Sequence, residues 1–380
     1  MMSKKWKITL VLILTIVVIS TSFITGCIVG FGSSKSPDYI LINQAWNAIY
    51  QNYVDQSKLD KVTQSRGAIR GILDSLDDPY STFLDPSDYQ LFETDLEGNF
   101  QGIGAQISMN SNDQPVITAI VENSPAASSG LKAGDILLAV DGKSTGDLSL
   151  TEIVLKVRGP EGTTVIITVL HEDDTEPVDI PIVRAEISQS TISAEMKNRV
   201  LYIRVREFAE TTNDDINAVL IANDLQNTNG IILDLRSNPG GLVTSVIDVI
   251  SHFIKEGIII TMVDNQGNET SESVNPNGVY TDLPIVVLVD QYSASASEIL
   301  AGALQDYERA TIAGVMTYGK GSYNINIQLR DGSDIYLTVG RWLTPNGRPI
   351  EGIGIEPDFI LDVTGDDEIE WAINYLNRQQ

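Results

Sequence analysis

Apolar positions follow three different patterns along the chain. From Asp38 to about Asp95 they recur every three or four residues, which is the spacing of one helix face and predicts a small helical segment. From Phe100 to about Arg184 short apolar runs are broken by Gly, Pro and Asp, a pattern typical of short strands in a compact β-rich domain. From Ile187 onward apolar runs alternate with helical stretches, and this alternation predicts an α/β core.

The elements of the core are the clearest in the chain. Its apolar runs predict strands, its periodic stretches predict helices, and the Asp331-Gly332 pair predicts the turn of a hairpin. The expected strands cover residues 200–205, 230–235 and 284–289, the hairpin strands cover 325–329 and 335–339, and the helices lie near 214–225, 242–254 and 367–376, with a further helix beginning at 296.

These changes of pattern predict a multidomain protein of mixed fold class, α+β overall with an α/β core. The expected segments are an anchor and linker (1–37), a helical segment (38–96), a β-rich domain (97–186), an α/β core (187–365) and a C-terminal helix with a tail (366–380). A chain of 380 residues with 42% hydrophobic residues is long enough for two or three such units.

The first segment carries a targeting signal. The basic stretch Lys4–Lys7 precedes an apolar run, Ile8–Phe31, which is the arrangement of a signal sequence or a membrane anchor whose basic end stays in the cytoplasm. The remainder is then expected on the extracytoplasmic side of the cell envelope. Two forms of tethering stay open, because Ile24–Cys27 resembles a lipobox that would leave a lipidated Cys27, whereas the apolar residues beyond it fit an uncleaved transmembrane helix.

Charge and rare residues exclude several classes of function. The formal net charge is −26, which opposes binding to nucleic acid, so no nucleic-acid partner is expected. The chain has one cysteine, which excludes a disulfide framework, and the cysteine content gives no basis for a metal site. The two histidines, His171 and His252, leave little material for a Ser-His-Asp triad. We therefore expect neither metal nor cofactor, and any nucleophilic chemistry needs another base.

A serine-rich turn follows the apolar run 283–289. The stretch Asp290–Glu298 crowds small residues between an expected strand and an expected helix, where the Ser295 hydroxyl would be exposed and the amide of Ala296, at the helix N-terminus, could face a developing oxyanion. A structural alternative is a capping box formed by Ser295 and Glu298, which would only start the helix.

Two glycine-rich segments could complete such a site. Lys320 lies between two glycines just before a strand, and an amine buried there would have a lowered pKa and could accept the serine proton, although a solvated loop cation is the simpler interpretation. After the strand 230–235, the sequence Ser-Asn-Pro-Gly-Gly ends in Gly240 and Gly241, whose amides could complete an oxyanion hole or could belong to an ordinary turn.

The β-rich domain carries a signature for recognising peptide ends. The stretch Phe100–Gly104 could turn backbone N–H groups toward an anion, and the segment Ser124–Leu137 followed by Asp141-Gly142 closely resembles the PDZ signature. A PDZ domain binds an extended peptide tail as an added strand and holds its terminal carboxylate in a nest of amides. The resemblance implies that Gly102, Ile103 and Gly104 form the carboxylate loop and that the partners are polypeptides with free C-termini.

Taken in order, D-L-R-S-N-P-G-G, S-A-S-A-S-E-I, Q-D-Y-E-R-A and G-K-G-S resemble the C-terminal processing peptidases, or tail-specific proteases. The similarity covers roughly residues 38–362. It implies that Ser295 is the nucleophile, Lys320 the general base, and Ala296 with Gly241 (in preference to Gly240) the oxyanion donors. The family commonly has glutamine four residues after the lysine to orient it, where this chain has Asn324, so Asn324 is expected to take that role with a shorter side chain.

The resemblance implies a membrane-tethered serine endopeptidase that reads C-termini through its PDZ domain and processes or degrades extracytoplasmic proteins, with tail binding coupled to activation. A catalytically inactive PDZ scaffold is the main alternative, because Asn324 departs from the family pattern. A serine hydrolase of non-peptide amides or esters is a second alternative, which the PDZ signature disfavours. The helical segment could form a homo-oligomer or pack on the core.

Overall fold

A computed structural model describes residues 37–96, 100–110, 112–146, 148–171, 174–187, 190–275 and 278–378. The chain divides into two compact units, residues 1–68 and 69–380. The predicted anchor, including Cys27, lies outside the described residues. Within the described ranges, no helix combines the length and the apolar character that a bilayer span would need.

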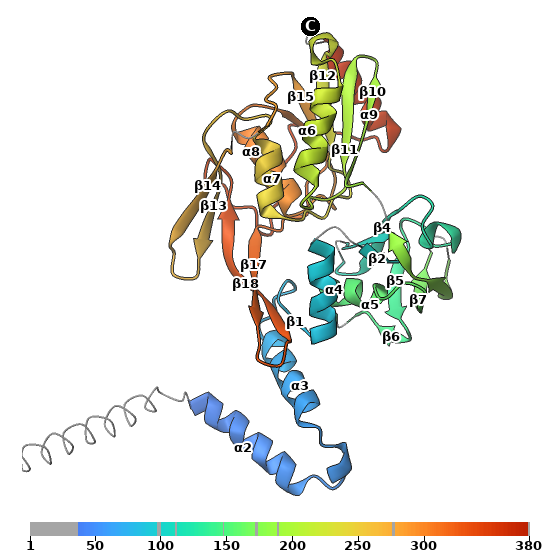
Figure 1. Ribbon diagram of the computed structural model, residues 1–380, viewed down its shortest axis with the longest axis vertical. Helices are drawn as coiled ribbons and strands as arrows, with labels where there is room; N and C mark the ends of the chain where they lie inside the picture. The colour runs from blue at the N-terminus through green and yellow to red at the C-terminus, as the bar shows by residue number, and fades with distance from the viewer. Residues whose placement is uncertain are drawn as a thin grey trace, which may run out of the picture. The chain divides into compact units, whose positions relative to one another are not determined.

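The described part of the first unit, residues 37–68, is helical, as the spacing of its apolar residues predicts. It contains α2 (Pro37–Asn52), the 3-10 turn η1 (Gln56–Lys58) and the beginning of α3 (Lys61–Asp74) (Figure 1). Asp60 caps α3, because its carboxylate accepts hydrogen bonds from the backbone N–H of Thr63 at 2.8 Å and from the Thr63 hydroxyl at 2.6 Å.

The β-rich module of the second unit is a sheet of short antiparallel strands with one covering helix. Its strands follow the order β3-β4-β5-β7-β8, with β6 paired to β5 and a separate pair formed by β2 and β9. The helix α5 packs Ile153 and Val157 into the module's own apolar core. The elements are β2 (Phe100–Gly102), β3 (Ala105–Met109), β4 (Pro115–Ile120), β5 (Ile136–Val140), β6 (Lys143–Ser144), α5 (Leu150–Val157), β7 (Thr164–Leu170), β8 (Val178–Val183) and β9 (Ala185–Ile187).

The α/β core is built on a six-stranded sheet with the order β10-β11-β12-β15-β16-β19. All its pairs are parallel except β10 with β11. The strands are β10 (Ile192–Lys197), β11 (Val200–Val205), β12 (Gly230–Asp234), β15 (Ile285–Val289), β16 (Thr311–Gly314) and β19 (Phe359–Ile360), and the helices are α6 (Thr212–Ala222), α7 (Val243–Ile250), α8 (Ala296–Asp306) and α9 (Asp366–Arg378) (Figure 1).

Side chains of alternate residues in the central strands are buried on opposite faces of this sheet. Ile231 and Leu233 pack in the cluster that includes α6, α7 and α8, whereas Ile232 packs in the cluster that includes Leu376 of α9. Because both faces are covered, β12 and β15 are buried at every position, which explains their apolar runs, residues 231–233 and 285–289. The loops after β12 and β15 lie at the carboxyl ends of parallel strands, where ligands bind in open α/β sheets.

A second sheet carries the hairpin that follows Lys320. It has the order β1-β18-β13-β14, and β17 pairs with β18. Its strands are β1 (Thr82–Leu84), β13 (Ile258–Asp264), β14 (Glu269–Ser273), β17 (Ser322–Gln328) and β18 (Asp334–Leu343), and the short helix α4 (Pro86–Leu96) follows β1. Trp342 of β18 is 2% exposed and packs in the same cluster as α7 and α8, so this sheet is fixed to the core.

The predicted mixed fold, with helical segment, β-rich module and α/β core, is confirmed. The strands expected at 200–205 and 284–289 and the helix starting at Ala296 occur within a residue of the expected positions. The hairpin β13–β14 was not predicted. Every residue of β14 is exposed and polar, so the sequence there lacks the alternation that marks a half-buried strand.

Candidate active site

The predicted nucleophile lies in a sharp turn between a buried strand and a buried helix. Ser295 follows β15, immediately precedes α8, and has φ 54° and ψ −114°. A positive φ is strained for a residue other than glycine, and such strain is common where a side chain is presented to a substrate. The backbone carbonyl oxygen of Ser295 accepts the hydrogen bond from Glu298 N at 2.9 Å. Ser295 and Glu298 thus form the capping box that the S-x-x-E spacing offered as the structural alternative.

Glu298 joins the serine turn to the lysine loop. Its Oε2 accepts hydrogen bonds from the backbone N of Ser295 and of Lys320, each at 2.9 Å. Its Oε1 accepts from the Thr317 hydroxyl at 2.6 Å and from Gly319 N at 2.7 Å. The nitrogens of Ser295 and Lys320 are therefore no more than two hydrogen-bond lengths apart. Burial raises the pKa of Glu298, and the four donors oppose that shift. The S-x-x-E spacing signalled the cap but not this link.

The Lys320 side chain is partly buried beneath an aromatic ring. Its Nζ lies 4.8 Å from the ring centroid of Tyr80. Burial lowers the pKa of Lys320, and the carboxylates of Glu351, Asp78 and Glu298 act in the opposite direction. Among the described residues no hydrogen bond joins Lys320 Nζ to the Ser295 hydroxyl. The structure thus brings the backbones of Ser295 and Lys320 together through Glu298.

Asn324 lies on β17 and contacts the turn that carries Tyr80. Its Nδ2 donates hydrogen bonds to the carbonyl oxygen of Tyr80 and to the hydroxyl of Thr338, both at 3.0 Å. Within the described part of the chain it makes no hydrogen bond to Lys320, and its role as lysine orienter stays a prediction.

The two glycines predicted for the oxyanion hole differ in what they contact. Gly240 is packed against the serine turn, since a Cβ added there would be 2.8 Å from Ser295 Cβ and 2.9 Å from Ala296 N. The Gly240 N–H already donates to Asn238 Oδ1 at 2.8 Å. Gly241 is exposed and lies against Phe208, whose carbonyl oxygen would be 2.3 Å from an added Cβ. The occupied N–H of Gly240 favours Gly241 as the donor to an oxyanion.

Several hydrogen bonds fix the glycine loop to the serine turn. Ser237 N donates to both carboxylate oxygens of Asp290 at 2.9 Å, and Ala294 N donates to the carbonyl oxygen of Asn238 at 3.0 Å. The Ser297 hydroxyl donates to the same carbonyl oxygen at 3.0 Å. The loops after β12 and β15 therefore form one rigid unit around Ser295.

The predicted carboxylate loop lines a cavity of about 390 Å³. The carbonyl oxygens of Ile103 and Gly104 accept hydrogen bonds from Ala126 N at 2.8 Å and Val121 N at 2.9 Å, which fixes the loop in the β-rich module. Gly102, Ile103 and Gly104 line the cavity together with Gly241 of the core. The predicted peptide-binding loop and the candidate oxyanion glycine thus line the same cavity.

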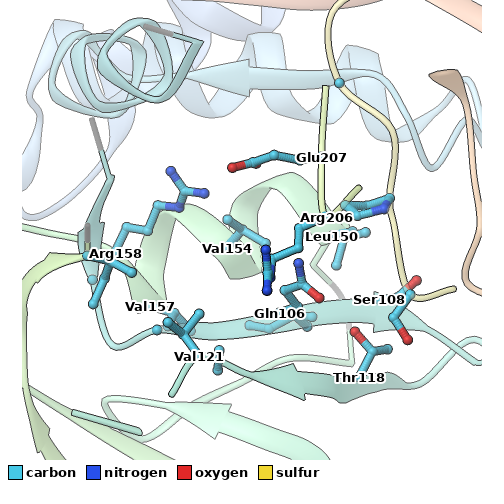
Figure 2. A pocket seen from close by; sticks show the side chains of 18 of the residues that line it. Gln106, Ser108, Thr118, Val121, Leu150, Val154, Val157, Arg158, Arg206 and Glu207 are labelled. Atoms are coloured by element: carbon cyan, nitrogen blue, oxygen red, sulfur yellow. The ribbon is translucent and has the colours of Figure 1, made fainter. Parts of the chain in front are cut away.

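Two charged side chains of this cavity were not anticipated from the sequence. Figure 2 shows Arg158, from the β-rich module, with its guanidinium toward the carboxylate of Glu207, from the core. Burial lowers the pKa of Arg158 to about 10 and raises the pKa of Glu207. No local motif marks either residue, because their proximity depends on the packing of two modules.

Three family models match the chain. The model of peptidase family S41 matches residues 199–361, that of the PDZ domain matches residues 116–170, and that of the activating protease CtpB N-terminal domain matches residues 32–87. The matches cover the core, the β-rich module and the helical segment, respectively.

Two relatives align over most of the chain. A carboxyl-terminal-processing protease of Synechocystis sp. is 35% identical over 369 residues, which cover 90% of this chain and 86% of the relative. A probable CtpA-like serine protease of Staphylococcus aureus is 32% identical, covering 94% of this chain and 73% of the relative. Among solved structures, a photosystem II D1 C-terminal processing protease is similar with a TM-score of 0.71 and 28% identity, covering 90% of this chain and 97% of that structure.

Proposed function

Because this chain belongs to the carboxyl-terminal-processing proteases of peptidase family S41, we propose that it is an endopeptidase in which Ser295 is the nucleophile and Lys320 the general base. The chain is a serine-type peptidase with a PDZ domain. One observation carries the assignment of these two residues: a single carboxylate oxygen of Glu298 accepts hydrogen bonds from the backbone N of both Ser295 and Lys320.

The proposed reaction proceeds through an acyl-enzyme. The neutral amine of Lys320 takes the proton of the Ser295 hydroxyl while the oxygen attacks the peptide carbonyl, and the N–H groups of Ala296 and Gly241 stabilise the oxyanion. The protonated amine then gives the proton to the leaving amine as the peptide bond breaks. A water molecule, deprotonated by the same lysine, hydrolyses the acyl-enzyme and frees the hydroxyl. Burial supports this role, since it favours the neutral form of Lys320.

Replacing Glu298 by Gln is expected to lower kcat about a hundredfold. The amide offers only one oxygen for four donors, so at least one buried N–H loses its partner and the serine and lysine loops shift apart. Steady-state cleavage of a short fluorogenic peptide measures the effect. Glu152→Gln is the matched control. Glu152 likewise accepts a hydrogen bond from the backbone N–H of its helix N-cap residue, Ser149, but it does so in the β-rich module and not at Ser295. Equal losses in both variants would contradict the linking role.

We further propose that the PDZ domain selects substrates by their free C-terminal carboxylate at Gly102, Ile103 and Gly104. The shared cavity of this loop and Gly241 supports a connection between tail binding and the reaction centre. The proposed substrates are proteins outside the cytoplasm that carry an accessible C-terminal tail, trimmed or degraded from that tail.

The experiment that tests this function compares cleavage of a protein substrate that bears a flexible C-terminal tail with hydrolysis of a short internal peptide. Gly104→Ala is expected to reduce kcat/KM for the tailed protein about tenfold or more, because its Cβ would lie 2.3 Å from Ser124 Cβ at a φ of 78°. Hydrolysis of a short internal peptide should change less than twofold. The control is Gly130→Ala in the same module, where φ is 94° and no atom lies within 4 Å. Equal losses on both substrates would refute selection by the tail.

For the location, we propose that residues 1–31 tether the catalytic part to the outer face of the cytoplasmic membrane. The basic stretch Lys4–Lys7 before the apolar run Ile8–Phe31 supports this arrangement, and lipidation at Cys27 and an uncleaved helix are its two forms. Cell fractionation tests it: the full chain should sediment with membranes, and a chain secreted without the run should not.

A further inference from the structure

The turn that covers the lysine is held in shape by Asp78. The carboxylate of Asp78 accepts hydrogen bonds from Tyr80 N at 3.1 Å and from the Ser81 hydroxyl at 2.6 Å. Ser81 is 7% exposed, and β1 begins at the next residue. Tyr80 is therefore fixed at the end of a tight turn rather than at the tip of a free loop.

The same turn is bound to the hairpin of β17 and β18. Thr338 N donates to the Ser81 hydroxyl at 3.0 Å, and Thr82 of β1 pairs with Tyr336 of β18. Asn324 Nδ2 adds the hydrogen bond to the Tyr80 carbonyl oxygen at 3.0 Å. The Oδ1 of Asn324 is buried and has no hydrogen-bond partner among the described residues. Asn324 therefore contacts the turn through its Nδ2 group, which holds the carbonyl oxygen of Tyr80.

The ring of Tyr80 in turn contacts the amine. Lys320 Nζ lies 4.8 Å from the ring centroid, within the range of a cation–π interaction, which favours the protonated form of the amine. Burial and the neighbouring Tyr318 raise the pKa of Tyr80, so its phenol stays neutral. The charged groups that also face the amine are Asp78 in the turn, Glu298 in α8 and Glu351 in the loop after β18.

We propose that Asn324 positions the general base indirectly: its amide holds the carbonyl of Tyr80, and the ring of Tyr80 holds the Lys320 side chain and sets the pH at which the amine loses its proton. Both are positioning residues, and the inference rests on the proposed role of Lys320. A direct Asn324–Lys320 contact is not needed for it.

The test is a double-mutant cycle on the pKa of the Lys320 amine. Acetic anhydride labels the neutral amine, and the pH dependence of labelling at Lys320, read by peptide mass spectrometry, gives this pKa in Tyr80→Leu, Asn324→Leu and the double variant. All variants carry Ser295→Ala, so the readout does not depend on cleavage and an inactive enzyme leaves it unaffected. Tyr80→Phe is the control that keeps the ring, and Tyr80→Met replaces Tyr80→Leu if the latter does not fold.

Loss of the ring is expected to lower the amine pKa by about 0.5–1 unit, since the cation–π attraction is lost. Tyr80→Phe should leave it within about 0.2 unit of the parent chain. Asn324→Leu should also lower the amine pKa. In the Tyr80→Leu background the same substitution should cause no further shift, because the amide would act only through the ring. Additive shifts would overturn the proposal, as would a rise in Tyr80→Leu or equal shifts in Tyr80→Leu and Tyr80→Phe.

Discussion

Ser295→Ala and Lys320→Ala are each expected to reduce cleavage of an unstructured protein at least about a thousandfold. Removing either group ends proton transfer from the hydroxyl to the amine, so the two losses should be similar and the double variant should lose little more. Lys320→Arg should be equally inactive, because a guanidinium keeps its proton and cannot serve as the base. Cleavage followed by gel electrophoresis and intact mass measures these losses.

One control for this prediction lies next to the nucleophile, and the other is a lysine of a different module. Ser297→Ala removes a hydroxyl two residues from the nucleophile that only donates to the Asn238 carbonyl oxygen, so its cleavage rate should fall less than tenfold. Lys132→Ala removes an exposed lysine of the β-rich module and should have no effect. Substantial activity in Ser295→Ala would show that Ser295 is not the nucleophile. A loss in Ser297→Ala as large as in Ser295→Ala would contradict the assignment as well.

Gly240→Ala is expected to lower kcat by about a thousandfold through geometry alone. Its Cβ would lie 2.8 Å from the Ala294 carbonyl oxygen and 2.8 Å from Ser295 Cβ, at a φ of 109°. The glycine loop must then move away from the serine turn, which displaces the Gly241 N–H and Ser295 together. Stopped-assay kinetics on the short peptide give kcat, and circular dichroism checks that the variant folds.

Gly267→Ala provides the matched control for Gly240. Its φ is 82°, and an added Cβ would have no atom within 4 Å, so it carries the same kind of backbone strain without the contact. We expect it to lose about 1 kcal/mol of stability and no activity. If Gly240→Ala kept a tenth or more of wild-type kcat, the glycine loop would not form the wall of the reaction centre.

Much of the fold could be predicted because the relevant signals are local. The strands β12 and β15 are buried on both faces, so their apolar runs stand out without any knowledge of partners. The turn around Ser295 and the glycines flanking Lys320 are likewise short sequence features. Each of these features lies within a few residues of the candidate catalytic residue whose backbone it positions.

The parts of the site that could not be predicted depend on contacts between distant segments. Tyr80 reaches Lys320 from a turn 240 positions earlier in the chain, and nothing in the turn itself indicates that an amine lies beneath its ring. The S-x-x-E spacing indicates for Glu298 only the alternative of a helix cap, and its link to the lysine depends on a loop that folds back beside α8. Arg158 and Glu207 approach each other only when the β-rich module and the core are assembled.

The central claim is that an uncharged Lys320 amine activates the Ser295 hydroxyl. Its most direct test is the rate at which a fluorophosphonate probe phosphonylates the wild-type chain and Lys320→Ala as a function of pH, with fluoride as the leaving group and the labelled residue identified by mass spectrometry. The account predicts labelling at Ser295, with a rate that rises with pH through a pKa below the 10.5 of an ordinary lysine and that falls at least about a hundredfold in Lys320→Ala. Equal labelling of Ser295 in both chains, with the same pH dependence, would contradict it.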